Sequence, residues 1–130
     1  MTVSVLLITH DGIGQSISDT AAAIRGAGSA RINCQSIPAK LKPHELGYYA
    51  DQVHHSIETL KSSDGLLILT DIYGATPNNL ARYFAEDDNI RVISGLNLPM
   101  LVRVLNYIDR PLAELAEIAL EGGHKGVKQD

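Results

Sequence analysis

The apolar run Val3-Ser4-Val5-Leu6-Leu7-Ile8 leads directly into Thr9-His10-Asp11-Gly12, and this stretch decides the fold. A short apolar run that is closed by a polar turn is typical of a buried strand in a parallel sheet. In open α/β sheets, ligands bind outside the carboxyl ends of the strands. We therefore expect His10 to lie at the edge of the sheet where function is usually found.

A second stretch repeats this arrangement. Residues 65–70 form another apolar run, Asp71 follows it, and residues 72–77 form a loop. Because the carboxyl ends of parallel strands meet at one edge of a sheet, the two stretches would place an imidazole beside a carboxylate. This expectation holds if the two strands are neighbours.

The rest of the chain predicts strands that alternate with helices. We expect strands at residues 3–9, 31–37, 66–70 and 90–94. We expect helices at 13–25, from near Pro43 to Leu60, from Thr76-Pro77 onward, from Met100 to about Tyr107, and from Pro111 to Gly122-Gly123. The prediction is one α/β domain, residues 1–130, with a single open, mostly parallel sheet and helices on both faces. The tail, residues 124–128, could add an antiparallel edge strand.

Composition and charge narrow the function classes. The net charge of −4 argues against a nucleic-acid partner, because no basic stripe is present. The longest apolar run is well short of the ~20 residues that cross a bilayer, and no signal peptide opens the chain. The single cysteine, Cys34, is expected to be a packed core thiol, and its isolation fits a reducing cytoplasm.

The strand-end groups suggest phosphoryl chemistry. A histidine can act as a base, a metal ligand or a nucleophile, and a carboxylate beside it would fix the ring tautomer. Gly74 and the helix start at Thr76-Pro77, like Gly12 and Gly14 after His10, would offer backbone amides that suit phosphate. The alternative is that His10 only ends a strand and Asp71 only binds amides of its own loop.

Other signals are weaker. Gly12-Ile13-Gly14 resembles the start of a dinucleotide-binding fingerprint, but Ile17 stands where the third glycine belongs. His54 and His55 are adjacent and would point to different faces of a helix. His44 and His124 lie in stretches that we expect to be exposed. We therefore expect no metal site and no cofactor.

Four blocks of sequence resemble the IIA component of the mannose family of the bacterial sugar phosphotransferase system. In order, they are the strand into Thr9-His10, residues 69–78, residues 95–101 and residues 121–127. The resemblance implies that His10 accepts a phosphoryl group from the carrier HPr and passes it to a IIB component. It implies that Asp71 hydrogen-bonds the His10 ring, and that the Thr76 hydroxyl and neighbouring amides contact the phosphoryl group.

The resemblance also implies a homodimer in which the C-terminal strand is exchanged. Tyr73 and Thr76 stand where mannose-specific members carry tryptophan and serine, so an amphipathic ring and a hydroxyl are retained. The chain ends at Asp130 without an Ala/Pro-rich linker or a IIB domain. We therefore expect a free-standing IIA component, which would contact a membrane transporter complex peripherally or serve a regulatory phosphorelay without a sugar.

A signalling receiver is the rival interpretation, with Asp71 as the phosphorylated residue. Receivers need an acidic pair after the first strand, and His10-Asp11 supplies only one carboxylate. They also need a lysine after a fifth strand, which the predicted topology does not supply. A purely regulatory binding module is compatible with phosphorylation of His10.

Overall fold

Four parallel strands form one sheet in the computed structural model, which describes residues 2–26, 28 and 30–130. The strands are β1 (Ser4–His10), β2 (Ile32–Ile37), β3 (Leu66–Thr70) and β4 (Ile90–Ser94). Their order is β2-β1-β3-β4, and every neighbouring pair is parallel. The strands that carry His10 and precede Asp71 are therefore direct neighbours.

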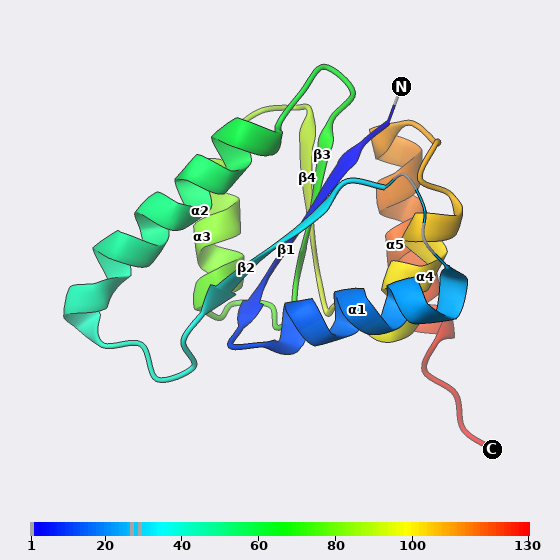
Figure 1. Cartoon of the computed structure of the whole chain (residues 1–130), viewed down its shortest axis with the longest axis horizontal. Coiled ribbons are helices and arrows are strands. Elements are labelled where there is room, and N and C mark those ends of the chain that lie inside the picture. Colours follow the sequence, from blue (N-terminus) through cyan, green and yellow to red (C-terminus); the bar gives the residue numbers. More distant parts are fainter. Residues whose placement is uncertain (1, 27, 29) are drawn as a thin grey trace.

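Helices cover both faces of the sheet (Figure 1). One face carries α2 (Leu46–Leu60), which follows the 3₁₀ turn η1 (Pro43–Glu45), and α3 (Thr76–Phe84). The other face carries α1 (Ile13–Arg25), α4 (Leu98–Asn106) and α5 (Leu112–Lys125). The predicted α/β class, with a parallel sheet between two helical layers, is confirmed.

Alternation along the strands divides the core into two. Successive strand side chains point to opposite faces, so Leu6 and Ile8 pack toward α2 and α3, while Val5 and Leu7 pack toward α1, α4 and α5. Each fully buried leucine or isoleucine contributes about 2 kcal/mol to folding. Burial on both faces explains why residues 5–8 of β1 are continuously apolar.

Most predicted boundaries agree with the structure to within two residues. The helix predicted after His10 is α1, and Gly26 ends it with a φ of +92°. The helix expected from Met100 begins earlier, at Leu98, because the Asn97 side chain accepts a hydrogen bond of 2.9 Å from the Met100 N–H and caps it.

The predicted end of the last helix is wrong. Gly122 and Gly123 lie inside α5, which continues to Lys125. A Cβ at Gly122 would lie 2.8 Å from Arg103 Cβ, and one at Gly123 would lie 2.8 Å from Met100 Cε. The two glycines therefore allow α5 to approach α4 closely and do not break the helix. Residues 126–130 form no strand within this chain.

Candidate functional site

The structure places His10 and Asp71 side by side at the carboxyl edge of the sheet. His10 is the last residue of β1, and Asp71 directly follows β3. The Nδ1 atom of the His10 ring lies 2.8 Å from Oδ2 of Asp71. The Asp71 side chain is only 7% exposed, whereas that of His10 is 21% exposed. The carboxylate is therefore enclosed, and the imidazole reaches solvent.

The Asp71 carboxylate determines which ring nitrogen of His10 carries the proton. Oδ2 also accepts the backbone N–H of His10 at 2.9 Å, and Oδ1 accepts the backbone N–H of Ile72 at 2.9 Å. An ionised carboxylate only accepts hydrogen bonds, so Nδ1 must donate to it. The other nitrogen, Nε2, then carries the lone pair. This is the arrangement of a nucleophile or of a base.

Opposing effects act on the pKa of Asp71. Burial raises this pKa. The hydrogen bonds from the His10 backbone and ring, the electrostatic interaction with His10 and the hydrogen bond from the Ile72 N–H lower it, and together they outweigh burial. The net result is a pKa below the ordinary value for aspartate. At neutral pH this group is an anion beside the imidazole, where it stabilises positive charge on the ring.

Asp11 holds the backbone after His10 in an unusual conformation. Its φ is +42°, a left-handed value that aspartate tolerates better than most residues. Its N–H donates to the Ile37 carbonyl at 2.8 Å, and its Oδ1 accepts the Ala39 N–H at 3.3 Å. The turn after His10 is thus tied to the end of β2, and such conformations often accompany functional sites.

The start of α1 is tied to the strand that carries His10. Thr9 Oγ1 accepts the backbone N–H of Gly14 at 2.8 Å, and both residues are buried. A Cβ at Gly14 would lie 3.0 Å from the same oxygen, so only glycine fits without movement. Gly12 is exposed, and a Cβ there would meet nothing within 4 Å. Gly14 is therefore a packing requirement, and Gly12 is open to a ligand.

The α3 helix begins at Thr76-Pro77, as the sequence predicted. Ala75 is the N-cap, Thr76 is the first helical residue and Pro77 the second, and no side chain caps the helix. Thr76 therefore does not cap α3, and its hydroxyl is not used in that role. The Thr76 backbone N–H lies in the first turn of α3, where N–H groups have no hydrogen-bond acceptor within the helix.

The loop before α3 uses an amide that we expected to face a ligand. Gly74 has a φ of +87°, and its N–H donates to Oδ1 of Asn78 at 2.9 Å. Its carbonyl accepts Nδ2 of Asn79 at 2.9 Å. Gly74 therefore shapes this loop, while its own N–H is engaged within the protein.

Sequence reasoning missed three polar residues behind the site. Thr9, Thr70 and Asn78 are each at most 1% exposed. Thr9 precedes His10, Thr70 precedes Asp71, and Asn78 connects the Thr70 hydroxyl to the Gly74 loop. The available signal was a threonine directly before each functional side chain, at the end of an apolar run in each strand.

Exposed side chains border this edge of the sheet. Ile13, at the start of α1, and Ile72 and Tyr73, in the loop before α3, are 44%, 60% and 70% exposed. The Arg82 guanidinium lies 5.5 Å from the centre of the Tyr73 ring and donates to its hydroxyl at 3.4 Å. Apolar groups with one cation suit a protein surface as partner.

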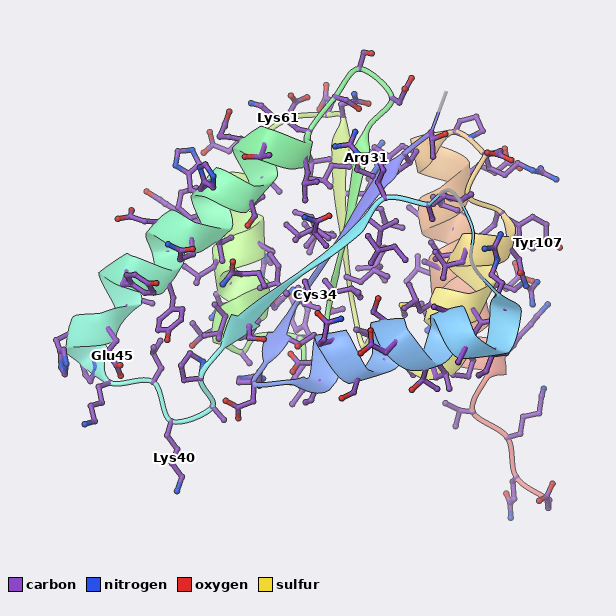
Figure 2. The ribbon with its side chains drawn as sticks, viewed as in Figure 1. Arg31, Cys34, Lys40, Glu45, Lys61 and Tyr107 are labelled. Carbon is purple, nitrogen blue, oxygen red and sulfur yellow. The ribbon has the colours of Figure 1, made fainter. Side chains whose placement is uncertain are left out.

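The other singled-out residues lie elsewhere. His44, His54, His55 and His124 are all exposed, as expected. Cys34 lies on β2, between this strand and α1 in Figure 2, and packs partly buried against the core. Burial raises the pKa of its thiol. In the described part of the chain, no three His, Cys, Asp or Glu side chains are grouped to hold a metal ion. No described helix is long and apolar enough to span a membrane.

The chain is similar in sequence to components of bacterial phosphotransferase systems. It is 29% identical to the PTS system mannose-specific EIIAB component of Escherichia coli K12 over 98% of this chain and 39% of that protein. It is 28% identical to the PTS system fructose-specific EIIA component of Bacillus subtilis over 80% of this chain and 69% of that protein. The chain thus spans about two fifths of the length of the mannose-specific relatives.

Solved structures share the fold. The mannose/sorbose-specific IIA subunit of Enterococcus faecalis superposes with a TM-score of 0.82 at 22% identity, over all of this chain and 96% of that one. A phosphotransferase system component EIIA of Streptococcus agalactiae gives 0.80 at 20% identity, over 98% and 96%. The model of the family described as "PTS system fructose IIA component" matches residues 4–118. The chain belongs to this family of IIA components of the sugar phosphotransferase system.

Proposed function

We propose that His10 accepts a phosphoryl group from HPr on Nε2 and passes it to a IIB component. The observation that supports this most directly is the 2.8 Å contact between Nδ1 and Asp71 Oδ2, which leaves the Nε2 lone pair as the reactive group. Asp71 orients the ring and stabilises the positive charge that develops on it.

The transfer requires no separate base. The Nε2 lone pair attacks the phosphorus of the phosphohistidine of HPr, a P–N bond forms on His10, and the P–N bond of the donor breaks. The electron pair of the broken bond returns to the donor nitrogen, and the proton on Nδ1 stays beside Asp71. In transfer to IIB, an acceptor group of IIB attacks the phosphorus, the P–N bond on His10 breaks and its electron pair returns to Nε2. Catalysis therefore comes from positioning and electrostatics.

Hydrogen-bond donors around His10 would hold the phosphoryl group. We assign this role to the Thr76 hydroxyl and N–H, to the Tyr73 backbone, and to Gly12 at the exposed start of α1, with Gly74 shaping the loop between them. The positive ends of α1 and α3 favour an anion here. Amides and a hydroxyl bind phosphate less tightly than arginines would, which lets the group leave again.

The partners would be proteins and not small molecules. The exposed rim of Ile13, Ile72 and Tyr73 offers a surface on which HPr and then IIB could dock. Because the chain spans 39% of the mannose-specific EIIAB relative, we propose that the IIB component is supplied outside these 130 residues. The site would act in the cytoplasm, against a membrane transporter complex or a regulatory partner.

We also propose a homodimer. Strand β4 lies at the end of the sheet order, so one side of it has no neighbouring strand among the described residues. Natural proteins rarely leave such an edge uncovered. Residues 126–130 follow α5 as an exposed segment that could pair with a second copy of the chain.

Phosphorylation with purified components tests the function. The chain, HPr, enzyme I and labelled phosphoenolpyruvate should give one acid-labile, base-stable phosphoryl group per chain, and a IIB domain should remove it. His10→Ala should remain unlabelled, whereas His55→Ala, at an exposed histidine on α2, should label fully. Full labelling of His10→Ala, or a label lost in base, would refute the proposal and favour a phosphorylated aspartate.

A further inference from the structure

Two consecutive asparagines hold the Gly74 peptide groups from both sides. Oδ1 of Asn78 accepts the Gly74 N–H at 2.9 Å, and Nδ2 of Asn79 donates to the Gly74 carbonyl at 2.9 Å. Asn78 is 1% exposed, while Asn79 is at the surface. Because glycine at a φ of +87° could readily adopt other conformations, these two bonds select one.

We call the Asn78 and Asn79 side chains that hold Gly74 the Gly74 clamp. The clamp is anchored in the sheet. Nδ2 of Asn78 donates to Oγ1 of Thr70 at 3.3 Å, and Thr70 is fully buried. Thr70 is the last residue of β3, pairs in register with Ile8 of β1, and directly precedes Asp71. A continuous set of contacts therefore runs from the strands that carry the reactive pair to the loop above it.

Packing alone does not explain Asn78. Burying an amide without partners is costly, and an apolar side chain would fill the same position more cheaply. In a capping box, the side chain at the third position of a helix reaches back to the N-cap N–H. Here the N-cap is Ala75, and Asn78 reaches one residue further, to Gly74 in the loop. Its geometry serves the loop more than the helix.

We propose that Asn78 and Asn79 are positioning residues for phosphoryl transfer at His10, with Thr70 as their anchor. They keep the loop from Asp71 to Ala75 in the shape that holds the Tyr73 backbone at the phosphoryl site, while the Ile72 and Gly74 N–H groups are engaged within the protein. A flip of a Gly74 peptide group would turn a carbonyl oxygen to where an N–H had been, and both bonds oppose that flip. The inference rests on the proposed function of His10.

The test separates the clamp from general stability. Asn79→Ala removes the exposed half of the clamp, and Thr70→Val removes the hydroxyl while keeping the shape of the side chain. Each should lower the single-turnover rate at saturating phosphorylated HPr by about tenfold or more. Thr70→Ser should restore the rate, because it restores the acceptor for Asn78. Hydrogen exchange at the Gly74 amide should speed up in the first two variants and not in the third.

Asn89 provides a matched control at the other end of the sheet. Its Nδ2 ties the loop before β3 by donating to the Ser62 and Ser63 carbonyls at 2.7 and 3.0 Å. Asn89→Ala should therefore lower the melting temperature without changing transfer or Gly74 exchange. Folded Asn79→Ala and Thr70→Val that transfer within about twofold of the wild-type rate would overturn the inference. A wild-type chain unlabelled at His10 would instead refute the proposed function, and Gly74 exchange would still test the clamp.

Discussion

Replacing Asp71 with asparagine should weaken both the fold and the transfer reaction. The carboxylate accepts the His10 backbone N–H, the His10 ring and the Ile72 N–H, at 2.9, 2.8 and 2.9 Å. An asparagine amide has a single acceptor oxygen. If that oxygen faces His10, the NH₂ group faces the Ile72 N–H, so one hydrogen bond is lost and two become neutral.

The expected cost follows from this geometry. A hydrogen bond to a charged group contributes about 1.5–3 kcal/mol and a neutral one about 0.5–1.5 kcal/mol. Asp71→Asn should therefore lower the free energy of unfolding at pH 7 by about 2 kcal/mol. The NH₂ group can also turn toward Nδ1 and favour the wrong ring tautomer, so transfer should slow by a factor on the order of 100.

The stability difference should depend on pH in one direction. The pKa of Asp71 is lowered in the folded protein, since its hydrogen bonds outweigh the effect of burial. Its contribution is therefore complete above the unfolded pKa of about 3.9 and is lost as the pH falls through the lower folded value. Urea unfolding at pH 7 and at about pH 3 should show the gap between wild type and Asp71→Asn narrowing in acid.

A control variant and a kinetic assay complete this test. Asp87→Asn alters an exposed carboxylate that accepts one backbone N–H, that of Asn89, at 2.9 Å, so it should change stability little and transfer not at all. Rapid-quench measurement of labelling by phosphorylated HPr gives the rates. A folded Asp71→Asn that transfers at the wild-type rate, or a stability gap that does not narrow in acid, would refute this reasoning.

Three further predictions concern other parts of the chain. Gly14→Ala should lower the free energy of unfolding in urea by about 1–3 kcal/mol, because its Cβ would press on Thr9. Gly12→Ala should leave this free energy unchanged, and equal effects of the two variants would contradict this account. Cys34 should react slowly with a thiol reagent at neutral pH and rapidly in urea, since burial raises the pKa of its thiol; equal rates would contradict a packed thiol. Deleting residues 126–130 should convert a dimer to a monomer in sedimentation, and a full-length monomer at micromolar concentration would exclude the exchanged tail.

The sheet and its helices could be predicted because their signals are local. The apolar runs of β1 and β3 are buried on both faces, and the turns that follow them contain the polar residues. Position at the carboxyl edge then brought His10 and Asp71 together once the two strands were neighbours. Here the physics of a parallel sheet links sequence position directly to spatial position.

Contacts between elements could not be predicted in the same way. Gly122 and Gly123 predict a helix end from conformational preference, but they lie inside α5, where a larger side chain would collide with α4. Asn78 also has no local signature, because its partners Thr70 and Gly74 meet it only after β3, the loop and α3 are folded together. Residues chosen for their tertiary contacts cannot be recognised from spacing alone.

The position of the phosphoryl group on the His10 ring tests the central claim most directly. Nitrogen NMR of the ¹⁵N-histidine-labelled chain, recorded after phosphorylation by HPr, distinguishes a phosphorus on Nε2 from one on Nδ1. Because Asp71 Oδ2 lies 2.8 Å from Nδ1, we expect the phosphorus on Nε2 and the proton retained on Nδ1. A phosphorus on Nδ1 of His10, or on the carboxylate of Asp71, would contradict this account.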